Sequence, residues 1–81
     1  MNKESVRQLI GAYAKLNADI TEISDDGDLF DAGLTSLNTV NLMLAIEDEY
    51  DIEFDDDSLT RETFQTVDAL LAVVSSLIKA A

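Results

Sequence analysis

Apolar residues recur at helical spacing in three separate segments of the chain. A stripe of Val6, Leu9, Ile10 and Tyr13, which Leu16 extends, predicts a first helix that ends near Asn17. A second helix is predicted from Ser36 to Tyr50, after the run Gly33-Leu34-Thr35 with its helix-breaking glycine. The last helix begins behind Thr66, a residue suited to N-capping, and its apolar positions are Val67, Leu70, Leu71, Val74, Leu77 and Ile78.

The segments between these helices are also patterned. Residues 17–35 form a long connection, but apolar anchors indicate that it is an ordered loop pinned to the helices; they are Ile20, Ile23, Leu29, Phe30 and Leu34. Residues 57–62 predict a short helical turn capped by Asp57 or Ser58. We therefore expect an all-α fold with three main helices, one short helix and a long first loop. At 81 residues, the chain supports a single domain over residues 1–81.

The predicted second helix has two apolar faces. At about 100° per residue, one side collects a stripe suited to the core, made of Thr39, Leu42, Met43, Ile46 and Tyr50. The opposite side carries Leu37, Val40 and Leu44, flanked by Asn41, Glu47 and Asp48. This second row predicts a partner-docking surface if it is exposed. The alternatives are a central helix with both faces in the core, or ordinary scattered surface hydrophobes.

Charge narrows the choice of partner. The formal net charge is −12, and fourteen Asp and Glu lie between Lys15 and Arg61, where no basic residue occurs. Such a surface repels nucleic acids and anionic lipid headgroups, so we expect neither as a partner and no membrane insertion. A solvated acidic surface is the simplest interpretation. If the second row docks, acids at its rim favour a basic protein partner and predict binding that weakens with salt.

The residue types absent from the chain exclude several kinds of chemistry. Without His or Cys, the chain cannot form a Ser-His-Asp or Cys-His catalytic group, or a zinc site of thiolates and imidazoles. With either Gly27 or Gly33 at the sixth position of an EF-hand loop, other ligand positions hold the wrong residues. Acid–base catalysis by paired carboxylates needs a cleft, and the sequence predicts none. We expect no catalysis and no metal site. The first residues lack an apolar signal segment, and the longest apolar run is residues 69–74, so we expect a cytoplasmic protein.

Residues 28–54 resemble the acyl carrier protein family. In that family a Gly-x-Asp-Ser-Leu motif precedes an acidic, apolar helix, and its Ser is esterified by 4'-phosphopantetheine; here the matching run is Gly33-Leu34-Thr35-Ser36-Leu37. The resemblance extends over nearly the whole chain, including Ile52 and Phe54 after the helix. It implies a four-helix bundle with phosphopantetheine on Ser36. The chain departs from the pattern at Thr35, where the family has Asp, and at Asn38 and Asn41, where acids are frequent.

The proposed attachment also has a physical basis. A phosphodiester on Ser36 would lie at a helix N-terminus, where free N–H groups and the helix dipole favour an anion. Gly33 can adopt φ > 0 and turn the loop sharply into the helix. The alternative is that Ser36 or Thr35 is a plain N-cap.

The resemblance implies partners and cargo as well. The family carries acyl or aminoacyl thioesters, and its partners are a phosphopantetheinyl transferase, a loading ligase and downstream transferases that dock on the second helix. We expect the chain to be a monomer. Residues 58–66 look like the same region of D-alanyl and other stand-alone aminoacyl carrier proteins. A long acyl chain would be sheltered between helices, near Leu42, Ile46, Phe54 and Leu59. The competing hypothesis is an acidic interaction domain in which Ser36 stays unmodified.

Overall fold

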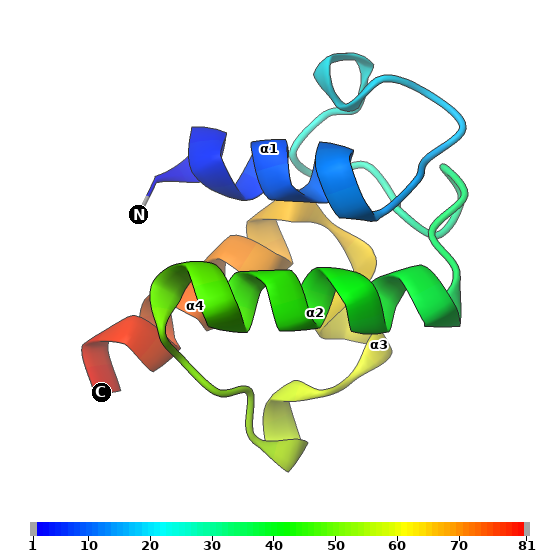
Figure 1. Ribbon diagram of the computed structural model, residues 1–81. Coiled ribbons are helices and arrows are strands. Elements are labelled where there is room, and N and C mark those ends of the chain that lie inside the picture. Colours follow the sequence, from blue (N-terminus) through cyan, green and yellow to red (C-terminus); the bar gives the residue numbers. More distant parts are fainter. Residues whose placement is uncertain (1, 81) are drawn as a thin grey trace.

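The computed structural model describes residues 2–80, and within them the regular structure is entirely helical (Figure 1). The four α-helices are α1 (Lys3–Tyr13), α2 (Ser36–Tyr50), α3 (Arg61–Gln65) and α4 (Val67–Ala80). Two short 3₁₀ turns, η1 (Ile20–Glu22) and η2 (Asp56–Ser58), lie in the connections. This confirms three main helices, a short helix and a long first loop. Within residues 2–80, no helix has the length and apolar character needed to cross a membrane.

The first helix is shorter than predicted. Its N-terminus is closed by a capping box, in which the Ser5 N–H donates to Asn2 Oδ1 at 2.8 Å and the Asn2 N–H donates to Ser5 Oγ at 3.3 Å. The helix ends at Tyr13, and Lys15 adopts a left-handed φ of 53°, which ends the α-helical path. The predicted end near Asn17 is therefore wrong. Leu16 continues the apolar spacing but packs against the core from the loop.

One hydrophobic core joins all four α-helices. In Figure 1, α1 and α2 lie side by side across the front, and α4 passes behind α2. The α1 helix packs on α2 and α4, and α3 packs on α4. The largest fully buried side chains are Ile10, Leu29, Leu42, Ile46, Leu70, Val6, Val67 and Val74. The long loop contributes Leu29 to this set and buried Leu34 beside it, so the prediction of an anchored loop is confirmed.

Three caps organise the chain between α2 and α4. The Asp55 carboxylate caps η2 by accepting from the Ser58 N–H at 2.9 Å, and Thr60 Oγ1 caps α3 by accepting from the Thr63 N–H at 3.3 Å. The prediction of Asp57 or Ser58 as the cap is wrong, because the region divides into two short pieces. The predicted cap at the start of α4 is confirmed, since Thr66 accepts from the Ala69 N–H at 3.0 Å.

Candidate functional site

Ser36 is the first residue of α2, and its hydroxyl is exposed. The N-cap is Thr35, whose side chain accepts from the Asn38 N–H at 3.2 Å. Thr39 donates to the Thr35 carbonyl through both its N–H and its hydroxyl, at 2.8 and 2.7 Å. Thr35 thus takes the capping role, and within residues 2–80 the Ser36 hydroxyl makes no hydrogen bond. The cap interpretation holds for Thr35, and the Ser36 hydroxyl is left available for reaction.

Gly33 makes the sharp turn into α2, as predicted. Its φ is +113°, a conformation that residues with a Cβ rarely adopt. A Cβ at this position would also lie 2.9–3.1 Å from atoms of the Asn17 side chain. The Asn17 N–H donates to the Ala32 carbonyl at 2.7 Å, so the two ends of the long loop meet here. The loop therefore fixes the position from which Ser36 starts the helix.

Asp28 closes the turn that leads to Gly33. Its carboxylate accepts from the N–H groups of Phe30 at 2.9 Å and Asp31 at 3.3 Å, and from the Gln65 side chain at 3.2 Å. Partial burial by itself raises the pKa of Asp28. The hydrogen bonds from Gln65, Asp31 and Phe30, together with the charge of Arg61, outweigh burial and hold that pKa below its usual value. The Leu29 N–H also donates to the Gln65 carbonyl at 2.7 Å, which ties the turn to α3.

Arg7 of α1 anchors the middle of the same loop. Its guanidinium donates to the carbonyl oxygens of Ile20 and Ile23, the latter at 2.6 Å, and to Asp25 Oδ1 at 2.7 Å. Lys3 pairs with the other oxygen of Asp25 at 2.8 Å. The hydrogen bond from Lys3 is the main cause that holds the pKa of Asp25 below its usual value, and the contacts with Arg7 lower it further. Sequence reasoning missed this anchor, since the partners of Arg7 lie 13–18 residues away along the chain.

The lowered pKa of Asp25 predicts a specific pH dependence for the variant Asp25→Asn. A carboxyl group with a lowered folded-state pKa stabilises the fold above its unfolded pKa of about 4, and this stabilisation is lost as the pH falls further. We expect wild type to be more stable than Asp25→Asn by a constant margin from neutral pH to about pH 5, and the margin to shrink below about pH 4. Urea unfolding of both proteins across this range measures the margin. A margin that stays unchanged at pH 3 contradicts the prediction.

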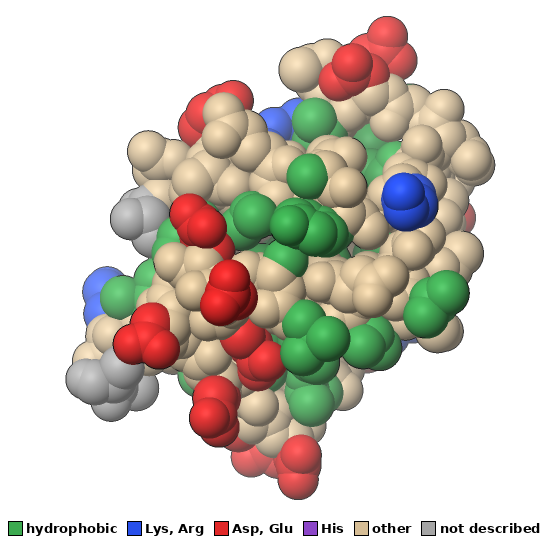
Figure 2. Space-filling view, viewed as in Figure 1, with side chains coloured by type: hydrophobic (Ala, Val, Ile, Leu, Met, Phe, Trp, Pro, Cys, Tyr) green, Lys and Arg blue, Asp and Glu red, His purple; other side chains and the backbone are tan. Residues whose placement is uncertain are grey.

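The second apolar row of α2 is exposed. The exposed fractions are 72% for Leu37, 48% for Val40 and 53% for Leu44, so the alternative with both faces in the core is wrong. Asn41 and Asp48 beside the row are exposed as well. Figure 2 shows hydrophobic side chains over this part of the surface and acidic side chains gathered toward the C-terminal end of α2 and the following loop. A hollow of about 630 Å³ adjoins the row and is lined by Leu44, Glu47, Asp48, Asp51, Ile52, Glu53 and Leu77.

Glu47 differs from the other predicted docking residues. It is half-buried, and its Oε2 accepts from the Phe54 N–H at 2.9 Å. This hydrogen bond ties the chain after α2 back onto the helix. One Glu47 oxygen therefore has a structural role, although the residue also lines the acidic hollow.

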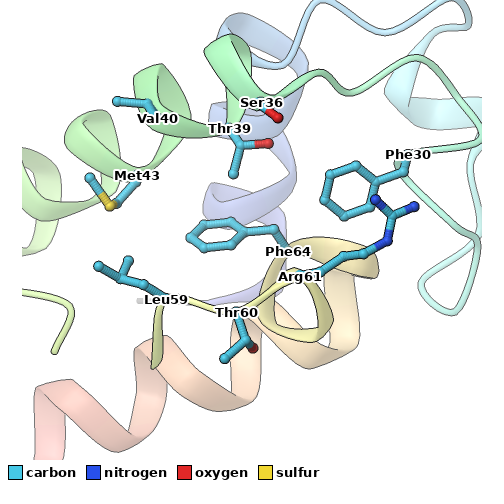
Figure 3. A pocket seen from close by; sticks show the side chains of 9 residues that line it. All are labelled: Phe30, Ser36, Thr39, Val40, Met43, Leu59, Thr60, Arg61 and Phe64. Carbon is cyan, nitrogen blue, oxygen red and sulfur yellow. The ribbon is translucent and has the colours of Figure 1, made fainter. Parts of the chain in front are cut away.

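An open cavity of about 380 Å³ lies beside Ser36, between α2 and the segment that leads into α3 (Figure 3). Its polar side has Ser36, Thr39 and the Arg61 guanidinium, and its apolar side has Val40, Met43, Leu59 and Phe64. Of the residues expected to shelter an acyl chain, Leu59 alone lines this cavity. The other three, Leu42, Ile46 and Phe54, are buried in the core between the helices, and their contact with an acyl chain stays a prediction.

The fold and site together define a class of protein. A small helical domain with a free hydroxyl at the start of a helix, next to an exposed apolar row, has the architecture of a carrier domain that presents a covalently attached group. The family described as "Phosphopantetheine attachment site" matches residues 4–74. The chain therefore belongs to the phosphopantetheine-binding carrier protein family. The prosthetic group of this family is 4'-phosphopantetheine, and the exposed, unbonded Ser36 hydroxyl beside an open cavity fits such a group.

The chain is similar to known carrier proteins over most of their length. An aminoacyl carrier protein of Agrobacterium fabrum is 38% identical over 66 residues, which cover 82% of this chain and 80% of the relative. A D-alanyl carrier protein of Streptococcus uberis is 36% identical over 72 residues, which cover 86% and 90%.

Solved structures give the same result. A carrier protein from Agrobacterium tumefaciens, in complex with an engineered Bradyrhizobium japonicum glycine:[carrier protein] ligase and AMP, is 35% identical with a TM-score of 0.87; the match covers 91% of this chain and 99% of that one. A holo acyl carrier protein from Nitrosomonas europaea is 26% identical with a TM-score of 0.82, covering 95% of both chains. The four-helix carrier fold predicted from the sequence is confirmed.

Proposed function

We propose that Ser36 is the attachment residue for 4'-phosphopantetheine and that the chain carries an aminoacyl group on it. The observation that carries the attachment is the exposed Ser36 hydroxyl, which is free of hydrogen bonds within residues 2–80 because Thr35 caps the helix. The first turn of α2 contains no acid, and its N–H groups and dipole favour the charge of a phosphodiester. When attached, the arm supplies a terminal thiol on which cargo is held as a thioester.

The packing of the core favours a small cargo. The residues that would have to part to admit a long acyl chain are packed in the core, where Leu42 and Ile46 are 0% exposed. The cavity beside Ser36 is open to solvent and does not enclose a long chain. The aminoacyl and D-alanyl relatives support the same cargo class.

Three kinds of partner enzyme act on the chain in turn. A phosphopantetheinyl transferase adds the arm, an amino acid ligase loads it and downstream transferases take the cargo. In each step the chain acts as the substrate of the partner enzyme. Leu37, Val40 and Leu44 supply the apolar contact, and Asn41, Glu47 and Asp48 form its polar and acidic rim. The glycine ligase bound to a similar carrier supports a ligase as partner.

The proposal is tested in two consecutive reactions. The apo chain is incubated with coenzyme A and a phosphopantetheinyl transferase of broad specificity, and its intact mass is measured. The product is then incubated with ATP, a carrier protein ligase and a panel of amino acids. We expect one phosphopantetheine per chain, then one amino acid in a bond that hydroxylamine cleaves. A chain that never gains the arm would instead support the unmodified interaction domain. A fatty acyl thioester on the protein from its native cell would refute the aminoacyl cargo.

Substitution of Leu44 by Glu tests the docking row. Leu44 is 53% exposed, so the change leaves the core intact, but it places a charge in the proposed contact. If Leu44 lies near the centre of the interface, kcat/KM for loading should fall about ten-fold or more. The matched control is Ala72→Glu, which adds the same charge at an exposed position of α4. Equal loading of both variants would show that the row does not contact the ligase.

A further inference from the structure

Arg61 occupies an unusual position at the cavity beside Ser36. Its guanidinium carbon lies 4.1 Å from the centre of the Phe30 ring, an arrangement that fixes the charge by a cation–π contact. Figure 3 shows the guanidinium stacked on Phe30 on the same side of the cavity as the Ser36 hydroxyl. No other Lys or Arg occurs between Lys15 and Lys79. In a chain of net charge −12, this single cation is held beside the proposed attachment residue.

The surroundings of Arg61 leave its charge available. Within residues 2–80, the ion pairs formed are those of Lys3 and Arg7 with Asp25, and Arg61 forms none. Asp28 lies close enough for its pKa to be lowered by Arg61, but its carboxylate already accepts hydrogen bonds from the turn and from Gln65. The residues at the start of α2, from Thr35 to Asn38, are uncharged. The exposed guanidinium therefore has hydrogen-bond donors free for an anion at the cavity.

We propose that Arg61, seated on Phe30, is a positioning residue that pairs with the phosphodiester on Ser36 and holds the arm over the cavity. This rests on the proposed attachment to Ser36. The phosphorus would be bonded directly to Ser36 Oγ, at the polar side of the cavity that Arg61 also lines. The methyl and methylene groups of the arm match the apolar side, made of Val40, Met43, Leu59 and Phe64. Arg61 thus biases the arm toward α3 and away from Leu37.

Nitrogen-15 NMR of the whole chain tests the pairing. The chain has two arginines, so its two Nε–H signals are assigned with Arg61→Gln, and Arg7 serves as an internal reference. On conversion of apo to holo protein, we expect the Arg61 Nε–H signal to shift and the Arg7 signal to remain in place. The phosphorus-31 signal of the arm should differ between wild type and Arg61→Gln. Lys79→Gln removes the same charge outside the cavity and should leave the phosphorus signal unchanged.

The position of the arm is measured with a spin label. Because the chain has no Cys, a maleimide nitroxide reacts with the arm thiol alone among thiols. We expect it to broaden the amide signals of Met43 and Leu59 in wild type. An exposed, charge-assisted pair should change the fraction of arm held there about two- to five-fold, so broadening should fall by that factor in Arg61→Gln. Arg61→Lys keeps the charge without the planar stacking group and should give an intermediate value.

The outcomes separate this inference from the attachment itself. A holo protein whose Arg61 signal does not shift, or equal broadening in wild type and Arg61→Gln, overturns the role of Arg61 and leaves the attachment standing. A wild-type chain whose mass never increases with coenzyme A and the transferase overturns the attachment, and the role of Arg61 with it. A mass increase, a shift confined to Arg61 and reduced broadening in Arg61→Gln support both.

Discussion

Substitution of Ser36 by Ala is expected to abolish phosphopantetheine attachment and to leave the fold almost unchanged. The oxygen that would be esterified is removed, so the gain of mass with coenzyme A and a transferase should disappear completely. The hydroxyl is exposed and forms no hydrogen bond within residues 2–80, so its loss removes no native contact. The free energy of unfolding should change by less than about 0.5 kcal/mol, as at most surface sites. Intact mass and urea unfolding of the same preparation measure both effects.

Thr35→Ala is the matched control for this result. Thr35 also carries a hydroxyl at the start of α2, but it accepts from the Asn38 N–H and caps the helix. Its removal should cost about 1 kcal/mol of stability while attachment continues. The two adjacent hydroxyls are therefore expected to show opposite behaviour. Attachment to Ser36→Ala, or its loss only in Thr35→Ala, would place the arm on Thr35 and refute the assignment to Ser36.

The elements with strong local signals were predictable from the sequence. The predicted bounds of the second helix, Ser36–Tyr50, are those of α2, because Gly33 precedes it, Thr35 caps it and Asp51 ends it with a left-handed φ of 54°. The row of Leu37, Val40 and Leu44 followed from helical geometry alone, whereas its exposure depends on how α2 packs. The start of α4 behind Thr66 was signalled in the same way. In each case the deciding residues lie within a few positions of one another.

The spacing of apolar residues predicted the wrong end for the first helix, because one apolar residue of the stripe lies in the loop. Leu16 continues the stripe of the first helix, yet the helix ends at Tyr13 and Leu16 reaches the core from irregular backbone. Tyr13 itself is 43% exposed, although its position in the stripe predicted a core residue. Burial alone does not distinguish a helical Leu from a loop Leu. The boundary was decided by the left-handed φ at Lys15, for which the sequence carries no glycine signal.

Long-range polar contacts carried no sequence signal. Arg61 stacks on Phe30, and Glu47 accepts from the Phe54 N–H, contacts that depend on how the helices pack. The sequence indicated the hydroxyl proposed for attachment and the second apolar row, which need only one helix. It did not indicate the cavity beside Ser36, because that cavity needs α2, α3 and the first loop in their final positions.

The charges at the two ends of α2 suit different tasks. Acids gather toward its C-terminal end and the following loop, where they border the hollow beside Leu44. At the other end, the first turn has no acid, and Arg61 lies beside Ser36. The acidic end would attract a basic partner, while the other end would accommodate the proposed phosphodiester. An Asp at position 35 would place a negative charge next to Ser36, so the Thr found here fits this division.

Substitution of Arg7 by Met is expected to give a large loss of stability. Met retains much of the apolar stem but removes the donors that reach the carbonyl oxygens of Ile20 and Ile23. The Arg7 side chain is only 16% exposed, so the groups left behind are partly shielded from water. The lost hydrogen bonds should cost about 2–4 kcal/mol, a large share of the stability of so small a domain. Because 1 kcal/mol shifts Tm by about 4–8 °C at this size, Tm should fall by about 10 °C or more.

Lys3→Met is the control, because Lys3 pairs with the same Asp25 through an exposed side chain and contacts no loop carbonyl. It should lower Tm much less than Arg7→Met does, since exposed ion pairs contribute little.

Hydrogen exchange then shows which part of the chain loses stability in Arg7→Met. If Arg7 holds the long loop, the N–H groups of Asn17 and Leu34, which bond within it, should exchange faster in Arg7→Met even well below Tm. Ser36 follows this loop directly, so the same variant should also be modified more slowly by the transferase when the loop opens. Equal Tm values for the two variants would show that Asp25, and not the carbonyl contacts, accounts for the role of Arg7.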